Sequence, residues 1–277
     1  MLVSEINPRR AAAALSILNL AWSIGAVVSP PIIAALIVEG ARIGRLSGLA
    51  VLLAIVALYL LQFRESANIG GSRTNLVAAF GIREWSRPLA AAFGAMFFLY
   101  VGTENAIGGW VATYANRLSS QPGARWELAP SLFWAALFCG RAVAPTVLRY
   151  VRDAKIAIAG LLVTGLGITT LLVSSTLTGV FIGVSLAGLG LSSVFPIVIA
   201  MLMRCFGAAG SQVAGSMFAL AGLGGATLPW LVGYSSGQFR DLGVGLVVPL
   251  IGTLIMVVLQ FSNYTSLSKE ESRSSPP

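Results

Sequence analysis

The stretch that decides the fold runs from Lys155 to Ser174 and reads KIAIAGLLVTGLGITTLLVS. Beyond Lys155 it has no charged side chain, and its length matches the roughly 20 residues with which an α-helix crosses a bilayer core of ~30 Å. Because lipid offers the backbone no hydrogen-bond partners, such a segment must be a helix that satisfies its own backbone groups. The sequence therefore predicts a transmembrane helix here.

Seven other apolar stretches of similar length account for most of the remaining chain. Hydrophobic residues make up 56% of the 277 residues and charged residues only 10%, whereas a soluble domain carries about 25% charged residues. The 31 glycines suit close helix packing in lipid. The expected fold is an all-α polytopic transmembrane bundle with eight spans, at residues 13–37, 44–62, 88–111, 128–148, 155–174, 177–203, 212–237 and 243–262.

The basic residues indicate how these spans are oriented. If both termini are cytoplasmic, 13 of the 18 Lys and Arg residues lie on the cytoplasmic side, and Arg42, Arg45, Arg117, Arg125 and Arg240 lie outside. This bias follows the positive-inside rule, so the net charge of +8 does not call for a nucleic-acid partner. The first apolar stretch is too long for the core of a cleavable signal peptide. We expect a multi-pass protein of the plasma (inner) membrane, with the lipid bilayer as its surroundings.

The residue inventory argues against catalysis. The chain has no histidine, and its two cysteines, Cys139 and Cys205, form no metal-binding or redox spacing. Serine–histidine catalysis, histidine-ligated haem and histidine-dependent metal sites therefore lack their usual groups. We expect no catalytic residues, no metal site and no cofactor, and an intramembrane enzyme is the least favoured interpretation.

A short pattern recurs at an offset of 199 residues. Gly25 and Pro30 in the first span match Gly224 and Pro229 in the seventh, and each pair is followed by one more span. Transporters are commonly built from internal repeats of this kind. If the first two spans correspond to the last two, then residues 88–264 form a complete six-helix unit.

Four segments resemble the major facilitator superfamily, and within it the fucose-permease-like sugar transporters. They read FFLYVGTENAIGGW at 97–110, LFWAALFCGR at 132–141, GLGLSSVFP at 188–196 and AGSMFALAGLGGATLPW at 214–230. The resemblance implies helices five to twelve of a twelve-helix fold, with helices one to four absent. Residues 1–62 would hold the last two helices of an incomplete N-terminal half, 63–87 a cytoplasmic linker, 88–264 the C-terminal half, and 265–277 a cytoplasmic tail.

The implied activity is secondary active or facilitative transport of a small polar solute, sugar-like in this group, by alternating access. A proton is the candidate coupling ion. The alternative is a non-transporting membrane scaffold or remnant, because the expected helices one to four are missing.

Glu104 is the acid placed well inside a span, where a charge costs about 2.5 kcal/mol or more. With Tyr100 one turn earlier and Asn105 beside it, Glu104 is a candidate for binding a solute hydroxyl or carrying a proton; the alternative is that it braces a neighbouring helix. Arg141 is grouped with the basic cluster after it, as a candidate gating or structural ion-pair set: Arg141, Arg149, Arg152 and Asp153.

Amides and tryptophans are the remaining candidates, since an indole stacks on the apolar face of a sugar while amides bind its hydroxyls. Those chosen for a sugar-sized cavity are Asn19, Trp22, Asn105, Trp110, Trp134 and Gln212. For Trp110 and Trp230 the alternative is an interfacial belt position, and for Trp134 packing in the bundle. Helix kinks are expected at Pro30, Pro31, Pro196 and Pro229.

Overall fold

The computed structural model describes residues 88–118, 125–207 and 210–274, together with isolated positions between 48 and 58. The side chains of 88, 211, 212 and 263–274 are not part of that description. The first two expected spans, most of the expected linker, and the candidates Asn19, Trp22, Pro30 and Pro31 lie outside it. The side chain of Gln212 lies outside it too.

Seven helices make up the described part of the chain, and no strand occurs in it. They are α5 (Pro88–Leu118), α6 (Leu128–Val147), α7 (Asp153–Val173), α8 (Leu177–Leu191), α9 (Val194–Phe206), α10 (Gly210–Phe239) and α11 (Leu242–Ser274). Because α8 and α9 together make one apolar segment, the described residues contain six candidate membrane spans. The all-α transmembrane prediction is confirmed, while the count of eight stays a prediction.

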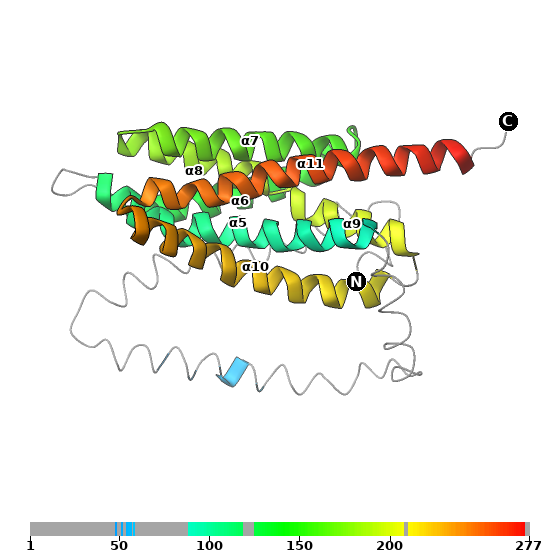
Figure 1. Ribbon diagram of the computed structural model, residues 1–277, viewed down its shortest axis with the longest axis horizontal. Helices are drawn as coiled ribbons and strands as arrows, with labels where there is room; N and C mark the ends of the chain where they lie inside the picture. The colour runs from blue at the N-terminus through cyan, green and yellow to red at the C-terminus, as the bar shows by residue number, and fades with distance from the viewer. Residues whose placement is uncertain are drawn as a thin grey trace.

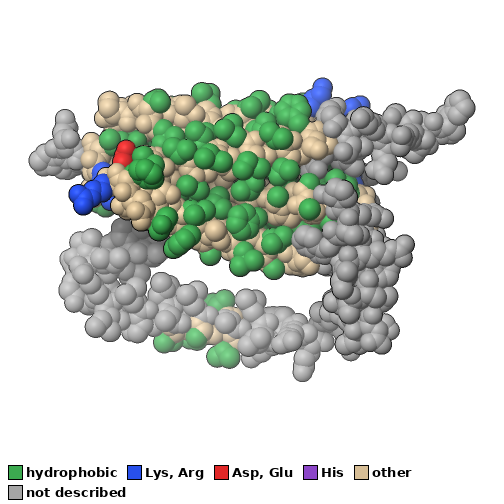
Figure 2. All heavy atoms as spheres, viewed as in Figure 1, with side chains coloured by type: hydrophobic (Ala, Val, Ile, Leu, Met, Phe, Trp, Pro, Cys, Tyr) green, Lys and Arg blue, Asp and Glu red, His purple; other side chains and the backbone are tan. Residues whose placement is uncertain are grey.

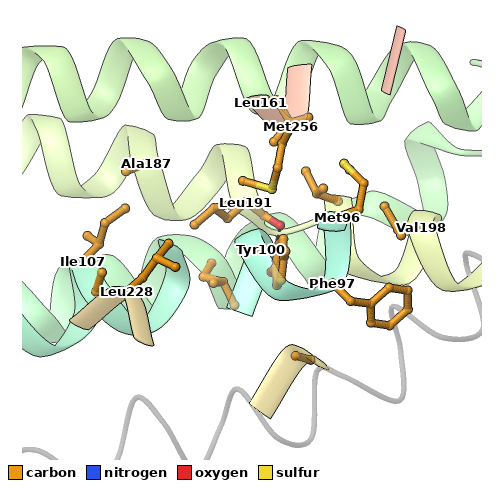
Figure 3. Packing of buried hydrophobic residues seen from close by; sticks show 14 of the residues in the cluster. Met96, Phe97, Tyr100, Ile107, Leu161, Ala187, Leu191, Val198, Leu228 and Met256 are labelled. Carbon is orange, nitrogen blue, oxygen red and sulfur yellow. Dashed lines mark hydrogen bonds between the residues drawn. The ribbon is translucent and has the colours of Figure 1, made fainter. Parts of the chain in front are cut away.

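The helices run side by side along the long axis of the molecule (Figure 1). The central helix is α5, which packs against α6, α8, α9, α10 and α11. Its inner face carries the large buried side chains of Phe93, Met96 and Phe97. They belong to the same hydrophobic core as Leu191 and Val198 of the α8–α9 segment, part of which is drawn in Figure 3. A polar side chain on this face of α5 is therefore enclosed by helices.

The outer surface is apolar in the middle and charged at the ends. Leu162, Leu166, Ile182, Leu254 and Val258 are exposed, each by more than half of its accessible surface. Hydrophobic side chains cover the visible face, and the Lys and Arg side chains seen on it gather at its two ends (Figure 2). A soluble protein could not expose so much apolar surface, and lipid is the solvent that matches it. The chain is an integral, multi-pass membrane protein.

Glycines let two helix pairs approach at backbone distance. A Cβ atom added to Gly183 of α8 would lie 2.7 Å from the backbone nitrogen of Leu171 and 2.8 Å from the carbonyl oxygen of Gly167, both in α7. On the other side of the bundle, a Cβ at Gly102 of α5 would lie 2.8 Å from the carbonyl oxygen of Gly224 in α10. Close packing of this kind stabilises helix pairs where water exclusion cannot.

The sixth expected span is broken rather than continuous. Helix α8 ends at Leu191, Ser192 and Ser193 form a turn, and α9 begins at Val194. Pro196 explains the position, because it has no N–H for the carbonyl of residue 192 and its ring clashes with that carbonyl. The kink expected at Pro196 is therefore present as a break one turn earlier. By contrast, α10 stays helical through Pro229.

Two helices extend beyond the apolar segments that indicated them. Helix α5 continues from the expected end at residue 111 to Leu118, and α11 continues to Ser274 through most of the segment expected as a tail. Hydropathy marks only the part of a helix that lies in lipid. Because a helix satisfies its own backbone hydrogen bonds, it can continue beyond the apolar segment.

Candidate functional site

A buried ion pair joins the two central residues of the site. The Nη2 atom of Arg141 in α6 lies 3.3 Å from Oε1 of Glu104 in α5, and the two side chains are exposed by only 2% and 7%. Arg141 is the largest fully buried side chain among the described residues. Since either charge alone would be costly in lipid or in a dry helix bundle, each is the main compensation for the other.

Tyr100 extends this pair into a network that reaches a third helix. Its hydroxyl group donates a hydrogen bond of 3.1 Å to the carbonyl oxygen of Leu191, the last residue of α8. Arg141 Nη2 donates to the same hydroxyl oxygen at 3.4 Å. In Figure 3 the Tyr100 side chain points from α5 toward Leu191. We call Tyr100, Glu104 and Arg141 the polar network; it links α5, α6 and the end of α8.

Three phenylalanine rings lie at one edge of this network. The ring of Phe195 stacks on Tyr100 with a centroid distance of 5.1 Å, and it contacts Phe97 at 5.4 Å and Phe218 at 6.1 Å in edge-on geometry. Phe195 is half-buried and Phe218 is exposed. Sequence reasoning missed Phe195 and Phe218, because a phenylalanine in an apolar span carries no signal of its neighbours.

Asn105 does not join the polar network. It is exposed although it lies near the middle of α5, and its Nδ2 atom is 2.7 Å from the Cβ position that Gly225 of α10 lacks. The amide therefore lies at the α5–α10 contact, on a different face from Glu104.

The two tryptophans of α5 and α6 contribute to packing between helices. Trp110 Nε1 donates a 2.9 Å hydrogen bond to the carbonyl oxygen of Pro229, so this side chain ties α5 to α10. Trp134 is partly buried, meets Phe133 edge-on at 5.0 Å, and lies 2.8 Å from the Cβ position at Gly108. Trp230 is 62% exposed and stacks on Tyr234 at 5.5 Å, which suits an interfacial aromatic pair.

The structure separates Arg141 from the basic cluster with which the sequence grouped it. Arg149 and Arg152 are exposed at the turn between α6 and α7, outside the bundle core. Asp153, in the first turn of α7, accepts a 2.6 Å hydrogen bond from Nη2 of Arg204 at the end of α9. Both charges suit their helix ends, an acid near an N-terminus and a base near a C-terminus. Arg204 was missed by sequence reasoning, because its partner lies 51 residues away.

Glu104 and Arg141 are the charged side chains that are buried in the described part of the chain. No group of three or more His, Cys, Asp or Glu side chains that could hold a metal ion occurs among the described residues. What the polar network provides is a carboxylate, a guanidinium and a hydroxyl inside an apolar bundle. Glu104 can give up its contact with Arg141 and bind a proton or a polar solute instead.

Comparison with known proteins agrees with this architecture. No protein-family profile matches the chain. Over 153 residues it is 31% identical to major facilitator superfamily domain-containing protein 4A of Xenopus tropicalis, a match that covers 53% of this chain and 30% of the relative. Over 180 residues it is 29% identical to protein 4B of the same name in Danio rerio, covering 62% of this chain and 33% of the relative. The matches thus span about a third of the length of these curated relatives.

The solved structures match more of the chain at lower identity. A crystal structure of the major facilitator transporter FucP in the outward conformation superposes with a TM-score of 0.76 at 14% identity, over 95% of this chain and 70% of that one. A structure of a variant of the E. coli fucose:proton symporter FucP gives 0.73 at 14% identity, over 94% and 71%. The resemblance to the superfamily is confirmed: the chain is similar in sequence to major facilitator superfamily domain-containing proteins, and it has the fold of the solved transporter FucP.

Proposed function

We propose that the chain takes part in transmembrane transport of a small polar solute, a sugar, by alternating access, and that Glu104 is the site where a proton or the solute acts. The observation that carries the proposal is the buried Glu104–Arg141 pair inside a bundle with this fold. An ionisable pair within a membrane span is costly to retain. Pairs of this kind commonly mark a substrate path or a proton relay.

The chemistry of the site supports a hydroxyl-bearing solute. A carboxylate accepts hydrogen bonds from hydroxyl groups, and the guanidinium of Arg141 can donate to ring or hydroxyl oxygens once it is no longer engaged by Glu104. The solved structures that share the fold include a fucose:proton symporter, which supports both a sugar and a coupling proton as proposals for this chain. Trp134, which packs against Gly108 one turn after Glu104 on α5, supplies an aromatic ring for a sugar in this proposal.

We also propose the domain division and the orientation expected from the sequence. Residues 88–264 form the C-terminal six-helix half, 1–62 the end of the N-terminal half, 63–87 the linker and 265–277 the tail. In the described helices, Arg149, Arg152, Lys155 and Arg204 lie at one end with the acid Asp153, and this end is the cytoplasmic one in the proposal. The opposite end carries Arg117, Arg125 and Arg240 with the acids Glu127 and Asp241.

Reporter fusions test this orientation. A fusion after Arg73 and a fusion at the C-terminus should both report the cytoplasmic side of the inner membrane, because both follow an even number of expected spans. A third fusion within residues 119–124, after α5, serves as the control and should report the opposite side. A periplasmic signal at either of the first two sites would refute the eight-span topology.

Uptake measurements test the transport proposal itself. The purified full chain is reconstituted into liposomes and supplied with a panel of labelled sugars, with and without a proton gradient. We expect substrate-dependent flux of at least one sugar above that of empty liposomes. No flux from any sugar in the panel would sink independent transport and favour a non-transporting membrane protein.

A further inference from the structure

The break between α8 and α9 coincides with the point where the polar network touches that span. In an uninterrupted helix the carbonyl oxygen of Leu191 accepts from the N–H group four residues later, which belongs to Phe195. Here the Tyr100 hydroxyl donates to this carbonyl at 3.1 Å, and the Phe195 ring stacks on the Tyr100 ring at 5.1 Å. One side chain of α5 therefore contacts both sides of the break.

Helix α9 is a short segment held differently at its two ends. At its start it follows the turn at Ser192 and Ser193, and at its end Gly207 adopts a left-handed φ of 51°. Near that end the Arg204–Asp153 bridge ties α9 to α7, with the arginine side chain 56% exposed. A bridge that water reaches contributes little, on the order of 1 kcal/mol or less. The hydrogen bond of Tyr100 to Leu191, just before the break, is buried and is not weakened by water in this way.

We infer that Tyr100 is a positioning residue that couples the Glu104–Arg141 pair to the α8–α9 break, so that a change at the pair shifts α9. The connection runs through Arg141, whose Nη2 atom donates to both Glu104 and Tyr100. When Glu104 gains a proton or a solute, Arg141 moves and the Tyr100 hydrogen bond to Leu191 is weakened. The functional meaning of this coupling rests on the proposed transport, but the coupling itself is measurable without any flux.

A native cysteine in α9 can be labelled to follow changes in this helix. The chain has two cysteines, and with Cys139→Ser in place the remaining one is the half-buried Cys205, the residue before the last of α9. The rate at which a water-soluble maleimide labels Cys205 in the purified full chain reports how accessible the end of α9 is. Four proteins in this background form a double-mutant cycle: the parent, Glu104→Gln, Tyr100→Phe and the double variant. The labelling rate of Cys205 is compared among them.

We expect Glu104→Gln to change the labelling rate by about three- to tenfold, the range that corresponds to altering one buried hydrogen bond. Tyr100→Phe keeps the ring and its stack on Phe195 but removes both hydrogen bonds, so Glu104→Gln should have no further effect in that background. Tyr114→Phe is the matched control, because Tyr114 also lies on α5 and donates to a backbone carbonyl, that of Leu171 in α7, at 3.1 Å. In the Tyr114→Phe background, Glu104→Gln should change the labelling rate of Cys205 by the same factor as in the parent.

Additive effects of Glu104→Gln and Tyr100→Phe would overturn the inference, as would an unchanged labelling rate in Glu104→Gln or an equal loss of coupling in Tyr114→Phe. Circular dichroism and thermal unfolding check that each variant is folded. If Tyr100→Phe does not fold, Phe195→Leu takes its place. It removes the ring stacked on Tyr100 and leaves both hydrogen bonds of the Tyr100 hydroxyl, so the effect of Glu104→Gln should remain, and its loss would overturn the route through the hydrogen bonds. Coupling without flux would leave the inference standing while the transport proposal failed.

Discussion

Replacing Arg141 with methionine is expected to destabilise the helix bundle by about 3–5 kcal/mol, because it leaves the Glu104 carboxyl group buried without its charged partner. Methionine fills a similar volume, so the loss reflects charge rather than packing. Thermal unfolding of the purified protein in one detergent, followed by tryptophan fluorescence, should show a midpoint lower by about 10 °C. Expression in the membrane should fall in parallel.

The second site of the pair provides the control for this result. The double variant Arg141→Met, Glu104→Gln removes both charges and should recover most of the lost stability, since the cost arises from one unpaired charge. Arg149→Gln, at an exposed arginine in the turn that follows α6, should change stability by no more than about 0.5 kcal/mol. If Arg141→Met were as stable as Arg149→Gln, the Glu104–Arg141 pair would have no role in stability.

Replacing Gly224 with alanine is expected to cost about 3 kcal/mol by forcing α10 away from α5. The added Cβ would overlap the carbonyl oxygen of Phe98, and it would lie 2.6 Å from the carbonyl carbon and 2.9 Å from the Cα of that residue. All three atoms are backbone, so no side-chain rotation can relieve the overlap, and overpacking of this kind is destabilising. The same unfolding measurement should show a lower midpoint and a broader transition.

Gly222→Ala, two residues earlier on α10, is the matched control for that variant. A Cβ at Gly222 would meet nothing within 4 Å. Alanine is the better helix former by about 1 kcal/mol, so Gly222→Ala should leave stability unchanged or raise it. If both glycine variants behaved alike, the close contact between α5 and α10 would not be a determinant of the fold.

Apolar length alone was enough to locate the described spans. The span expected at 128–148 is α6, Leu128–Val147, and the span expected at 155–174 is α7, Asp153–Val173. The reason is physical, since a bilayer imposes one length on every helix that crosses it. The prediction was less accurate where a helix leaves lipid, as at the end of α5, because water allows helix and loop alike.

The candidate site could be predicted only in part. The position of Glu104 in the sequence gave the cost of its charge and thus the need for a partner, and the structure places it in the interior at 5% exposure. The identity of the partner was not available, because Arg141 is 37 residues away and the rotation of α6 about its axis decides which side chains face α5. Closeness in sequence grouped Arg141 with Arg149 and Arg152 instead.

The break in the α8–α9 segment could also be predicted only in part. Pro196 indicated a local disturbance, and the clash with the carbonyl four residues earlier explains why it falls at Ser192 and Ser193. That Tyr100 of α5 would contact this break depends on how two helices pack, over a separation of 91 residues. One sequence carries no direct signal of such a contact.

The measurement that tests the role of Glu104 in transport most directly compares uptake by the parent chain and by Glu104→Gln. Both are reconstituted at equal density, and initial rates are recorded with and without an inward proton gradient. The parent should show sugar uptake that the gradient accelerates, whereas Glu104→Gln should fold, bind the sugar and lose that acceleration. Equal uptake by the two proteins at every pH would contradict the account and leave Glu104 as a residue that only holds α5 to α6.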